Sequence, residues 1–221
     1  MRNSFIASAI TDILLNSASE TESGNIELVL PNSSASLNPM AQQSPLQASS
    51  CTKNTFARTS DQRARVLNAV RLNINAFVGQ NGPGVVCLIY SVILTRGVQQ
   101  VYNDMDYEGI LLINEYGYAS QELINIMLVG RASTNVHDGD KDMGGDILLK
   151  GINKQSDVGF LTYFEHFGQL LVGNHLKRPR VPVWIICSES HYSVLFSTDM
   201  NLIKQGNMAK FDMVYYDELA R

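Results

Sequence analysis

His191 is the residue of this chain whose type and position best suit chemistry. It stands in the sequence CSESHYS, at residues 187–193, between two apolar stretches. A hairpin turn that enters a hydrophobic strand would hold the histidine at the strand edge and direct its ring toward a cleft. That placement suits a general base in thiol or hydroxyl catalysis. The same spacing also fits a turn histidine that only hydrogen-bonds the backbone.

Such a base needs a nucleophile, and the chain has three cysteines. Cys51 lies in a polar stretch that we expect to be flexible, where nothing would fix its geometry. Cys87 lies in an apolar helical stretch and should be an inert core thiol. Cys187 flanks the same turn as His191 and could face it, but its strand offers neither the helix N-terminus nor the cation that usually activates a thiol. For a serine nucleophile, the sequence has no GxSxG elbow.

Three aspartates alternate in a glycine-rich loop, at Asp138, Asp140 and Asp142, and raise the question of calcium binding. An EF-hand loop that began at Asp138 would need glycine at its sixth position and glutamate at its twelfth. Those positions hold Met143 and Leu149. A solvated turn is therefore the better interpretation. The sequence also lacks HExxH and a pair of CxxC motifs, so we expect no zinc site, no other metal and no cofactor.

The other three histidines have structural interpretations. His166 lies near the end of a predicted helix, where a cation suits the helix dipole. His137 lies in the acidic loop and His175 stands near two basic residues, so we expect both at the surface.

The composition limits the classes of function. The chain has 221 residues, of which 45% are hydrophobic and 17% charged, and its net charge is -4. This length fits one domain whose core needs no disulfides, and three cysteines point to a reducing compartment. Mild acidity without a long Lys/Arg run argues against nucleic acid as the main partner. The longest uncharged stretch, residues 72–95, is mostly apolar only over 85–94, so we expect no membrane span.

Hydrophobic spacing and turn residues predict the elements that must position His191. Helices are predicted at residues 4–16, 61–78 after a Ser60 cap, 85–96 closed by Gly97, 121–129 between Ser120 and Gly130, and 158–167 between Asp157 and Gly168. Strands are predicted at residues 26–30, 110–113, 183–187, 192–196 and 213–216. Residues 31–55, rich in polar residues, should form a flexible insert. Helices early and a hairpin late indicate an α+β domain.

Longer stretches of the sequence resemble the MINDY family of deubiquitinases, and within it the branch of the third and fourth human members. The similarity is dense from about residue 110 onward and thinner in the first hundred residues, where residues 85–97 still resemble a family helix. The matching stretches are GYASQELIN (117–125), GRASTNV (130–136), LLKGI (148–152), SDVGFLTYFEH (156–166), VGNHLKRPRVPVWIICSESHYSVLF (172–196) and FDMVYYDELA (211–220).

This resemblance implies a papain-like cysteine peptidase that cuts isopeptide bonds in polyubiquitin, with a preference for chains linked through ubiquitin's lysine at position forty-eight. In that family a helix-capping cysteine attacks the carbonyl, a strand histidine takes its proton, and an upstream glutamine helps to hold the oxyanion. His191 falls on the family's catalytic histidine. The implied partners are ubiquitin or polyubiquitin chains, and the family supports a cytosolic or nuclear location.

The sequence departs from the family pattern at the nucleophile. In the family that cysteine lies in a QGGPCG-like block upstream of the helix that residues 4–16 resemble, and this chain has no match to the block. The family's strand region beyond Tyr216 is also unmatched. We therefore expect residues 1–221 to be a partial MINDY-type catalytic domain, truncated at both ends, that bears the histidine of a cysteine deubiquitinase. The alternative is a catalytically inactive short form that acts as a ubiquitin-binding or interaction module.

Overall fold

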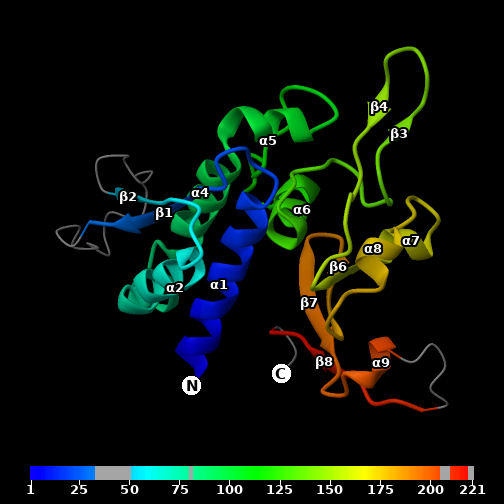
Figure 1. The fold of residues 1–221 in the computed structure, drawn as a ribbon. Helices are drawn as coiled ribbons and strands as arrows, with labels where there is room; N and C mark the ends of the chain where they lie inside the picture. Colours follow the sequence, from blue (N-terminus) through cyan, green and yellow to red (C-terminus); the bar gives the residue numbers. More distant parts are fainter. Residues whose placement is uncertain (33–50, 80–81, 205–209, 219–221) are drawn as a thin grey trace. The chain divides into compact units, whose positions relative to one another are not determined.

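The computed structural model describes residues 1–32, 51–79, 82–204 and 210–218 (Figure 1). The chain divides into two compact units, Met1–Val101 and Tyr102–Arg221, and each is described by itself. Helices dominate the first unit, and the second contains a four-stranded sheet. The α+β class predicted from the order of the elements is confirmed.

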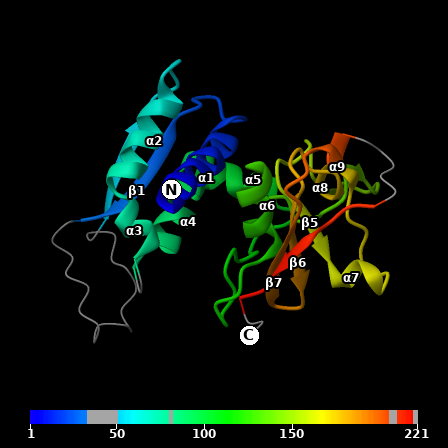
Figure 2. The ribbon, with the colours of Figure 1, turned by 90° about the horizontal axis from the view of Figure 1, so that it is seen from below.

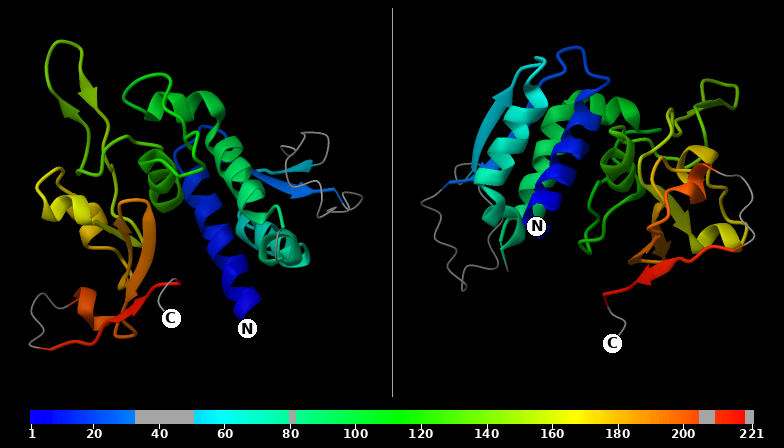
Figure 3. Two further views of the ribbon diagram at one scale, coloured as in Figure 1. Left: turned by 180° about the vertical axis from the view of Figure 1, so that it is seen from behind. Right: turned by 60° about the horizontal axis from the view of Figure 1, so that its bottom comes forward.

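The first unit is a layer of helices on a two-stranded sheet. Helix α1 (Arg2–Ala18) packs against α2 (Gln62–Leu72) and α4 (Gly84–Arg96), as the views in Figure 3 show. The short helix α3 (Ile74–Val78) packs on α4, and α4 also covers strand β1 (Ile26–Pro31). The core consists of apolar side chains from all these layers, including Ala7, Leu14, Leu28, Val66 and Val92. The predictions of a first helix, a first strand and an apolar helix closed by Gly97 are thus confirmed.

Hydroxyl groups of α4 satisfy the free edge of β1. The amide of Val29 donates to Ser91 Oγ at 2.8 Å, and the amide of Glu27 donates to Thr95 Oγ1 at 2.9 Å. These amides lie on the side of β1 that is not paired with a strand, where an uncovered edge would expose hydrogen-bonding groups. The polar residues within an otherwise apolar helix therefore hold the sheet on the helix layer.

The predicted flexible insert at residues 31–55 has the wrong boundaries. Pro31 belongs to β1, and Cys51–Phe56 form strand β2, which pairs antiparallel with β1 from Pro31↔Cys51 to Ile26↔Phe56. The polar residues of β2 fit an edge strand, because they need only backbone pairing and cross-strand partners. Thr55, for example, donates to Glu27 at 2.7 Å. Residues 33–50 lie outside the described residues.

The long helix predicted at residues 61–78 is also wrong in two details. Asp61, not Ser60, stands at its start, and the helix is broken at Asn73 into α2 and α3. The Asn73 side chain donates to the carbonyl of Ala69 at 2.9 Å, so it competes with the backbone for a helical acceptor. Asparagine disfavours helix interiors for this reason.

Helix α5 (Val98–Asp104), which the sequence pattern did not predict, follows α4 after Gly97. Gly97 has φ +89, a conformation that other residues rarely adopt. Among the described residues no single helix is long and apolar enough to span a bilayer, and α4 and α5 reach that length only as a pair bent by 83°.

A mixed sheet in the order β5-β6-β7-β8 organises the second unit. Strand β5 (Gly159–Thr162) runs parallel to β6 (Val183–Ser188), whereas β6, β7 (His191–Phe196) and β8 (Val214–Tyr216) are antiparallel neighbours. Figure 2 shows β5, β6 and β7 side by side. The second unit also contains helix α6 (Gln121–Val129) and a two-stranded ribbon of β3 (Lys141–Asp142) and β4 (Leu148–Leu149). Three short helices follow: α7 (Tyr163–His166), α8 (Asn174–Lys177) and α9 (Asn201–Lys204).

One face of this sheet carries the core of the second unit. Phe160, Ile185 and Cys187 pack there with apolar residues of α6, α8 and the connecting loops, among them Val129, Ile152 and Leu176. Helix α6 begins and ends as predicted: Ser120 Oγ accepts from the amide of Leu123, and Gly130 closes the helix with φ +79. The predicted hairpin and the final strand are confirmed as well.

Two predicted elements of this unit are wrong. Residues 110–113 do not form a strand, because Asn114 Oδ1 accepts from the amides of Tyr116 and Tyr118 and folds the segment into a turn. Ile113 makes only an isolated bridge to Ala119. The helix predicted at residues 158–167 is strand β5 followed by α7, with Thr162 as the cap in place of Asp157. An apolar run of this length fits both structures, and parallel pairing with β6 decides the outcome.

Candidate active site

The β6–β7 hairpin places His191 at the first position of a strand. Ser188 pairs with His191, so Glu189 and Ser190 form a two-residue loop. Glu189 adopts φ +55, the left-handed conformation that tight hairpin turns require at their first central residue. His191 therefore projects from the end of a hydrogen-bonded ladder. Its side chain keeps 35% of its surface exposed.

Asp217, directly after β8, holds the His191 ring. Its Oδ1 atom lies 2.9 Å from His191 Nε2, and its side chain is only 16% exposed. The second carboxylate oxygen accepts from the Tyr215 hydroxyl at 3.3 Å. Because β8 pairs with β7, the residue that follows β8 comes back beside the start of β7. The sheet thus joins two residues that are 26 positions apart.

This contact decides which nitrogen can act as a base. A carboxylate only accepts hydrogen bonds, so the Nε2 atom of a neutral ring must carry the proton that His191 donates to Asp217. The other nitrogen, Nδ1, then has its lone pair available for a proton from a nucleophile. The carboxylate would also stabilise the imidazolium that forms after proton transfer. The carboxylate of Asp217 thus orients the His191 ring.

Cys187 and His191 do not face each other. Neighbouring residues of a strand point to opposite sides of the sheet, and Cys187 pairs with Tyr192 whereas Ser188 pairs with His191. Cys187 accordingly lies in the core cluster, and its thiol donates to the carbonyl of Glu189 at 3.3 Å. Burial raises the pKa of the Cys187 thiol. A buried thiol on the far face cannot serve this histidine.

The other two cysteines belong to the first unit. Cys87 is fully buried in α4, as predicted, and burial raises the pKa of its thiol to about 11. Cys51 is a half-buried residue of β2, so its prediction as part of a flexible insert is wrong. The thiol of Cys87 interacts with that of Cys51, which adds to the rise in its pKa.

The alternating aspartates hold loops together. Asp138 accepts from the amides of Asn174 and His175, each at 2.8 Å. Asp140 accepts two hydrogen bonds from Arg131, at 2.8 and 2.9 Å, and this guanidinium lowers the pKa of the Asp140 carboxyl. Asp142 accepts from the amide of Gly144. The turn interpretation of these residues is thus supported by what their carboxylates bind.

The remaining histidines are structural. His137 Nδ1 lies 2.9 Å from the carbonyl of Gly139, and His175 Nδ1 lies 2.8 Å from that of Ile152. Both are half-buried, and the His175 side chain keeps 36% of its surface exposed, so the expected surface position fits His175 better than His137. The ring of His137 bonds within its own loop, whereas that of His175 ties α8 to the loop at Ile152. His166 ends α7, as expected near a helix end, and stacks on Tyr163.

Reasoning from the residues alone missed Asp217. The signal was present, because an aspartate directly follows the last predicted strand in the sequence VYYD. The sequence, however, does not say which strand lies beside His191. Only the sheet order, with β8 next to β7, makes this carboxylate a partner of the histidine.

A strand histidine oriented by a carboxylate is an arrangement that hydrolases with an activated nucleophile use. The chain belongs to the MINDY-3/4 family: the model described as "Deubiquitinating enzyme MINDY-3/4, conserved domain" matches residues 1–221. The chain is 47% identical over 145 residues to "Probable ubiquitin carboxyl-terminal hydrolase MINDY-4" of Bos taurus, which covers 63% of this chain and 19% of the relative.

Relatives from the other branch are similar as well. "Ubiquitin carboxyl-terminal hydrolase MINDY-3" of Bos taurus is 40% identical over 152 residues, which covers 68% of this chain and 33% of the relative. The MINDY-3 protein of Xenopus tropicalis is 45% identical over 125 residues, which covers 56% of this chain and 28% of the relative. The chain thus spans a fifth to a third of the length of these curated relatives. No solved structure matches the chain.

Proposed function

We propose that this chain carries the general base of a thiol-dependent deubiquitinase that hydrolyses isopeptide bonds in polyubiquitin. His191 is the base, and Asp217 fixes its ring. The observation that carries the proposal is the hydrogen bond of 2.9 Å between His191 Nε2 and Asp217, which leaves Nδ1 as the proton acceptor. Membership of the MINDY-3/4 family supports the choice of ubiquitin as the substrate.

The reaction needs one proton carrier and one thiol. His191 Nδ1 takes the proton of a cysteine thiol, and the thiolate attacks the isopeptide carbonyl carbon. As the C–N bond breaks, the imidazolium returns the proton to the departing lysine amine. Water then attacks the thioester carbonyl carbon and gives a proton to Nδ1. As the C–S bond breaks, the imidazolium returns that proton to the departing thiolate, and the ubiquitin carboxyl group is released. Asp217 stabilises the ring each time it becomes positive.

The thiol of this mechanism is not Cys187, which lies in the core on the far face of the sheet. We propose that a cysteine supplies this thiol from a region that corresponds to the part of the relatives not matched by these 221 residues. The papain-like arrangement, the preference for chains linked through ubiquitin's lysine at position forty-eight, and a cytosolic or nuclear location belong to the same proposal. They rest on the family resemblance and, for the location, on three free cysteines.

A second function fits the residues of this chain taken alone. Without a thiol at His191 Nδ1, these residues cannot form an acyl-enzyme. Recognition and chemistry use different groups, so the chain could still bind ubiquitin and act as an interaction module. The observation that favours this function is the separation of Cys187 from His191 on opposite faces of the sheet.

One experiment separates the two functions. The longest natural protein that contains this sequence is assayed with diubiquitin linked through lysine forty-eight, alongside His191→Ala and the control His166→Ala. His166 is exposed and stacks on Tyr163. We expect His191→Ala to lower the turnover by about a hundredfold or more and His166→Ala to leave it unchanged.

Equal rates for the His191→Ala variant and the parent protein would remove His191 from the mechanism. If no protein that contains the sequence cleaves diubiquitin, but the chain of 221 residues binds it by calorimetry, the interaction module is the correct function.

A further inference from the structure

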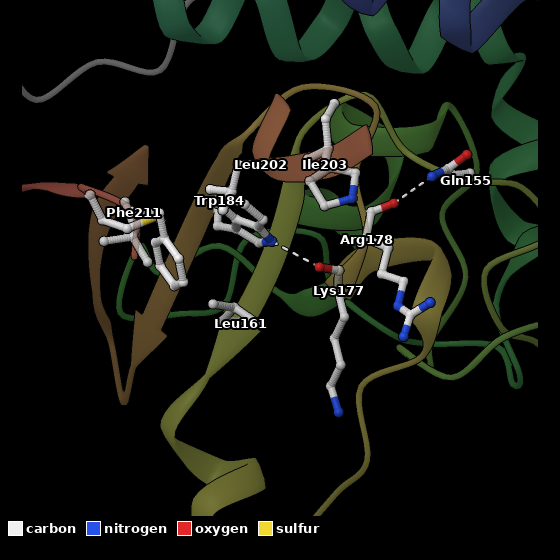
Figure 4. A pocket seen from close by; sticks show the side chains of 11 residues that line it. Gln155, Leu161, Lys177, Arg178, Trp184, Leu202, Ile203 and Phe211 are labelled. Atoms are coloured by element: carbon white, nitrogen blue, oxygen red, sulfur yellow. Dashed lines mark hydrogen bonds between the residues drawn. The ribbon is translucent and has the colours of Figure 1, made fainter. Parts of the chain in front are cut away.

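The second unit has a surface pocket that shares no lining residue with the core cluster and has no role in the mechanism above. Its volume is about 610 Å³, within the range of ligand sites in proteins. Figure 4 shows its floor on the sheet and its walls on the segments around α8 and α9. The apolar part includes Leu161, Trp184, Leu195, Leu202 and Phe211. A cavity with this lining excludes a strongly hydrated ligand and favours an apolar group.

The floor lies on the face of the sheet that carries His191. Trp184 pairs with Leu195, and Ser188 pairs with His191, so these four side chains lie on one side of the sheet. Leu195 and His191 are four residues apart on β7, which corresponds to roughly 13 Å. An occupant of the pocket would therefore lie on the same surface as the proposed base.

The indole of Trp184 is fixed before any ligand binds. Its Nε1 atom donates to the carbonyl of Lys177 at 3.0 Å. Gly159 lies opposite on β5, and a Cβ atom there would come within 2.3 Å of the indole ring. The glycine therefore allows the indole to lie against the strand. The side-chain Nε2 of Gln155 donates to the carbonyl of Arg178 at 2.5 Å and holds the neighbouring rim.

The charged residues of the pocket are basic. Among the described residues that line it, Lys177 and Arg178 are ionisable, and neither Asp nor Glu contributes. Lys177 is paired with Glu165 at 2.6 Å, whereas the exposed Arg178 makes no ion pair with a described residue. Figure 4 shows both side chains extending away from the indole. The positive charge thus lies at the rim, and the interior is apolar.

We propose that this pocket binds an aromatic or branched aliphatic side chain from an acidic peptide segment of a partner protein. A small amphipathic acid offers only a single carboxylate to the basic rim. A peptide can instead insert one apolar side chain while the carboxylates of its neighbours reach the rim, which is where Arg178 lies. Arginine binds carboxylates in a bidentate manner and gives the contact its specificity. This binding does not depend on the proposed hydrolysis.

Trp184 is the only tryptophan of the chain and makes a direct reporter. The chain of 221 residues is titrated with three peptides in which one phenylalanine is flanked by glutamates, by glutamines or by lysines. We expect a saturable change in tryptophan fluorescence with the glutamate peptide, and a dissociation constant about tenfold lower than for the glutamine peptide. The lysine peptide should not bind, and added salt should weaken the glutamate peptide selectively.

A pair of variants tests whether the positive charge of Arg178 contributes to peptide binding. Arg178→Gln should bring the affinity for the glutamate peptide to the level of the glutamine peptide. Arg180→Gln is the matched control, because Arg180 is exposed, pairs with Asp157 at 3.2 Å and does not line the pocket. It should leave the affinity for both peptides unchanged.

The peptide series uses the unchanged chain, so it tests the proposal even where a variant fails to fold. Equal binding of the glutamate and glutamine peptides would overturn the role of charge. No fluorescence change with any peptide would overturn the site. Tighter binding of 4-phenylbutyrate than of the glutamate peptide would show a small-acid pocket and overturn the peptide as its occupant.

Discussion

Cys187 and His191 lie on the two strands of one hairpin, close to its turn, yet their side chains lie on opposite faces of the sheet. The thiol of Cys187 is buried among Phe160, Ile185 and their neighbours, whereas the ring of His191 is partly exposed and bound to Asp217. Residues one position apart in register are therefore separated by the thickness of the sheet. The two residues are therefore close in the sequence, but the thiol of Cys187 and the ring of His191 cannot react with each other.

Cys187 should consequently react slowly with thiol reagents. Burial raises its pKa, so the reactive thiolate is scarce at neutral pH. With iodoacetamide at pH 8, we expect modification of Cys187 to be at least about tenfold slower in the folded chain than in urea, as followed by peptide mass spectrometry. A Cys187→Ala variant identifies its peptide. Faster reaction in the folded chain than in urea would show an activated thiol and reopen its pairing with His191.

Asp217→Asn should impair catalysis while leaving the fold intact. An amide can donate to His191 Nε2 and would favour the tautomer with its proton on Nδ1, which cannot accept a proton from a thiol. In the longest active protein that contains this sequence, we expect kcat to fall by about a hundredfold or more, with KM nearly unchanged. The melting temperature is measured in parallel.

Asp212→Asn is the matched control, because Asp212 is exposed and lies before β8. A purely structural role for Asp217 would lower the melting temperature and the activity together. An unaltered kcat would remove Asp217 from the site.

Ser91→Ala should destabilise the first unit. Ser91 Oγ donates to the carbonyl of Cys87 at 2.7 Å and accepts from the buried amide of Val29 at 2.8 Å. Without the hydroxyl, that amide loses its partner, which costs about 1–3 kcal/mol of unfolding free energy. Urea denaturation followed by circular dichroism measures the change. Ser60→Ala, at an exposed position that does not cap α2, should change it by less than about 0.5 kcal/mol.

Asp140→Asn should lower stability in a pH-dependent way. The Arg131 guanidinium lowers the pKa of Asp140 in the folded chain, so the charged form stabilises the fold above the unfolded pKa of about 4. This contribution is lost as the pH falls through the lower, folded value. Because the Asp140 side chain is 33% exposed, solvent screens this pair, and we expect the variant to be about 0.5–1 kcal/mol less stable at pH 7.

The difference should shrink as the pH falls below about 4. Asp142→Asn, whose carboxylate is exposed and accepts from one amide, is the control. A difference of equal size at pH 7 and at pH 2.5 would contradict the ionic origin of this stabilisation.

Local signals in the sequence determined many of the helices, strands and turns of this protein. The cap at Ser120, the glycine that ends α6, the apolar helix α4 and the hairpin at His191 all follow from residues that are close together in the chain. The family resemblance and the assignment of His191 also rest on contiguous stretches. Such features depend on backbone propensities and side-chain periodicity, which a sequence displays directly.

Only the tertiary structure decided the rest. Residues 159–162 could form either a helix or a strand, and parallel pairing with β6 selected the strand. The polar residues 51–56 became β2 because β1 lay beside them. Asp217 became the partner of His191 because β8 pairs with β7. In each case the energy comes from contacts between segments distant in the chain, and the residues themselves do not reveal which segments will meet.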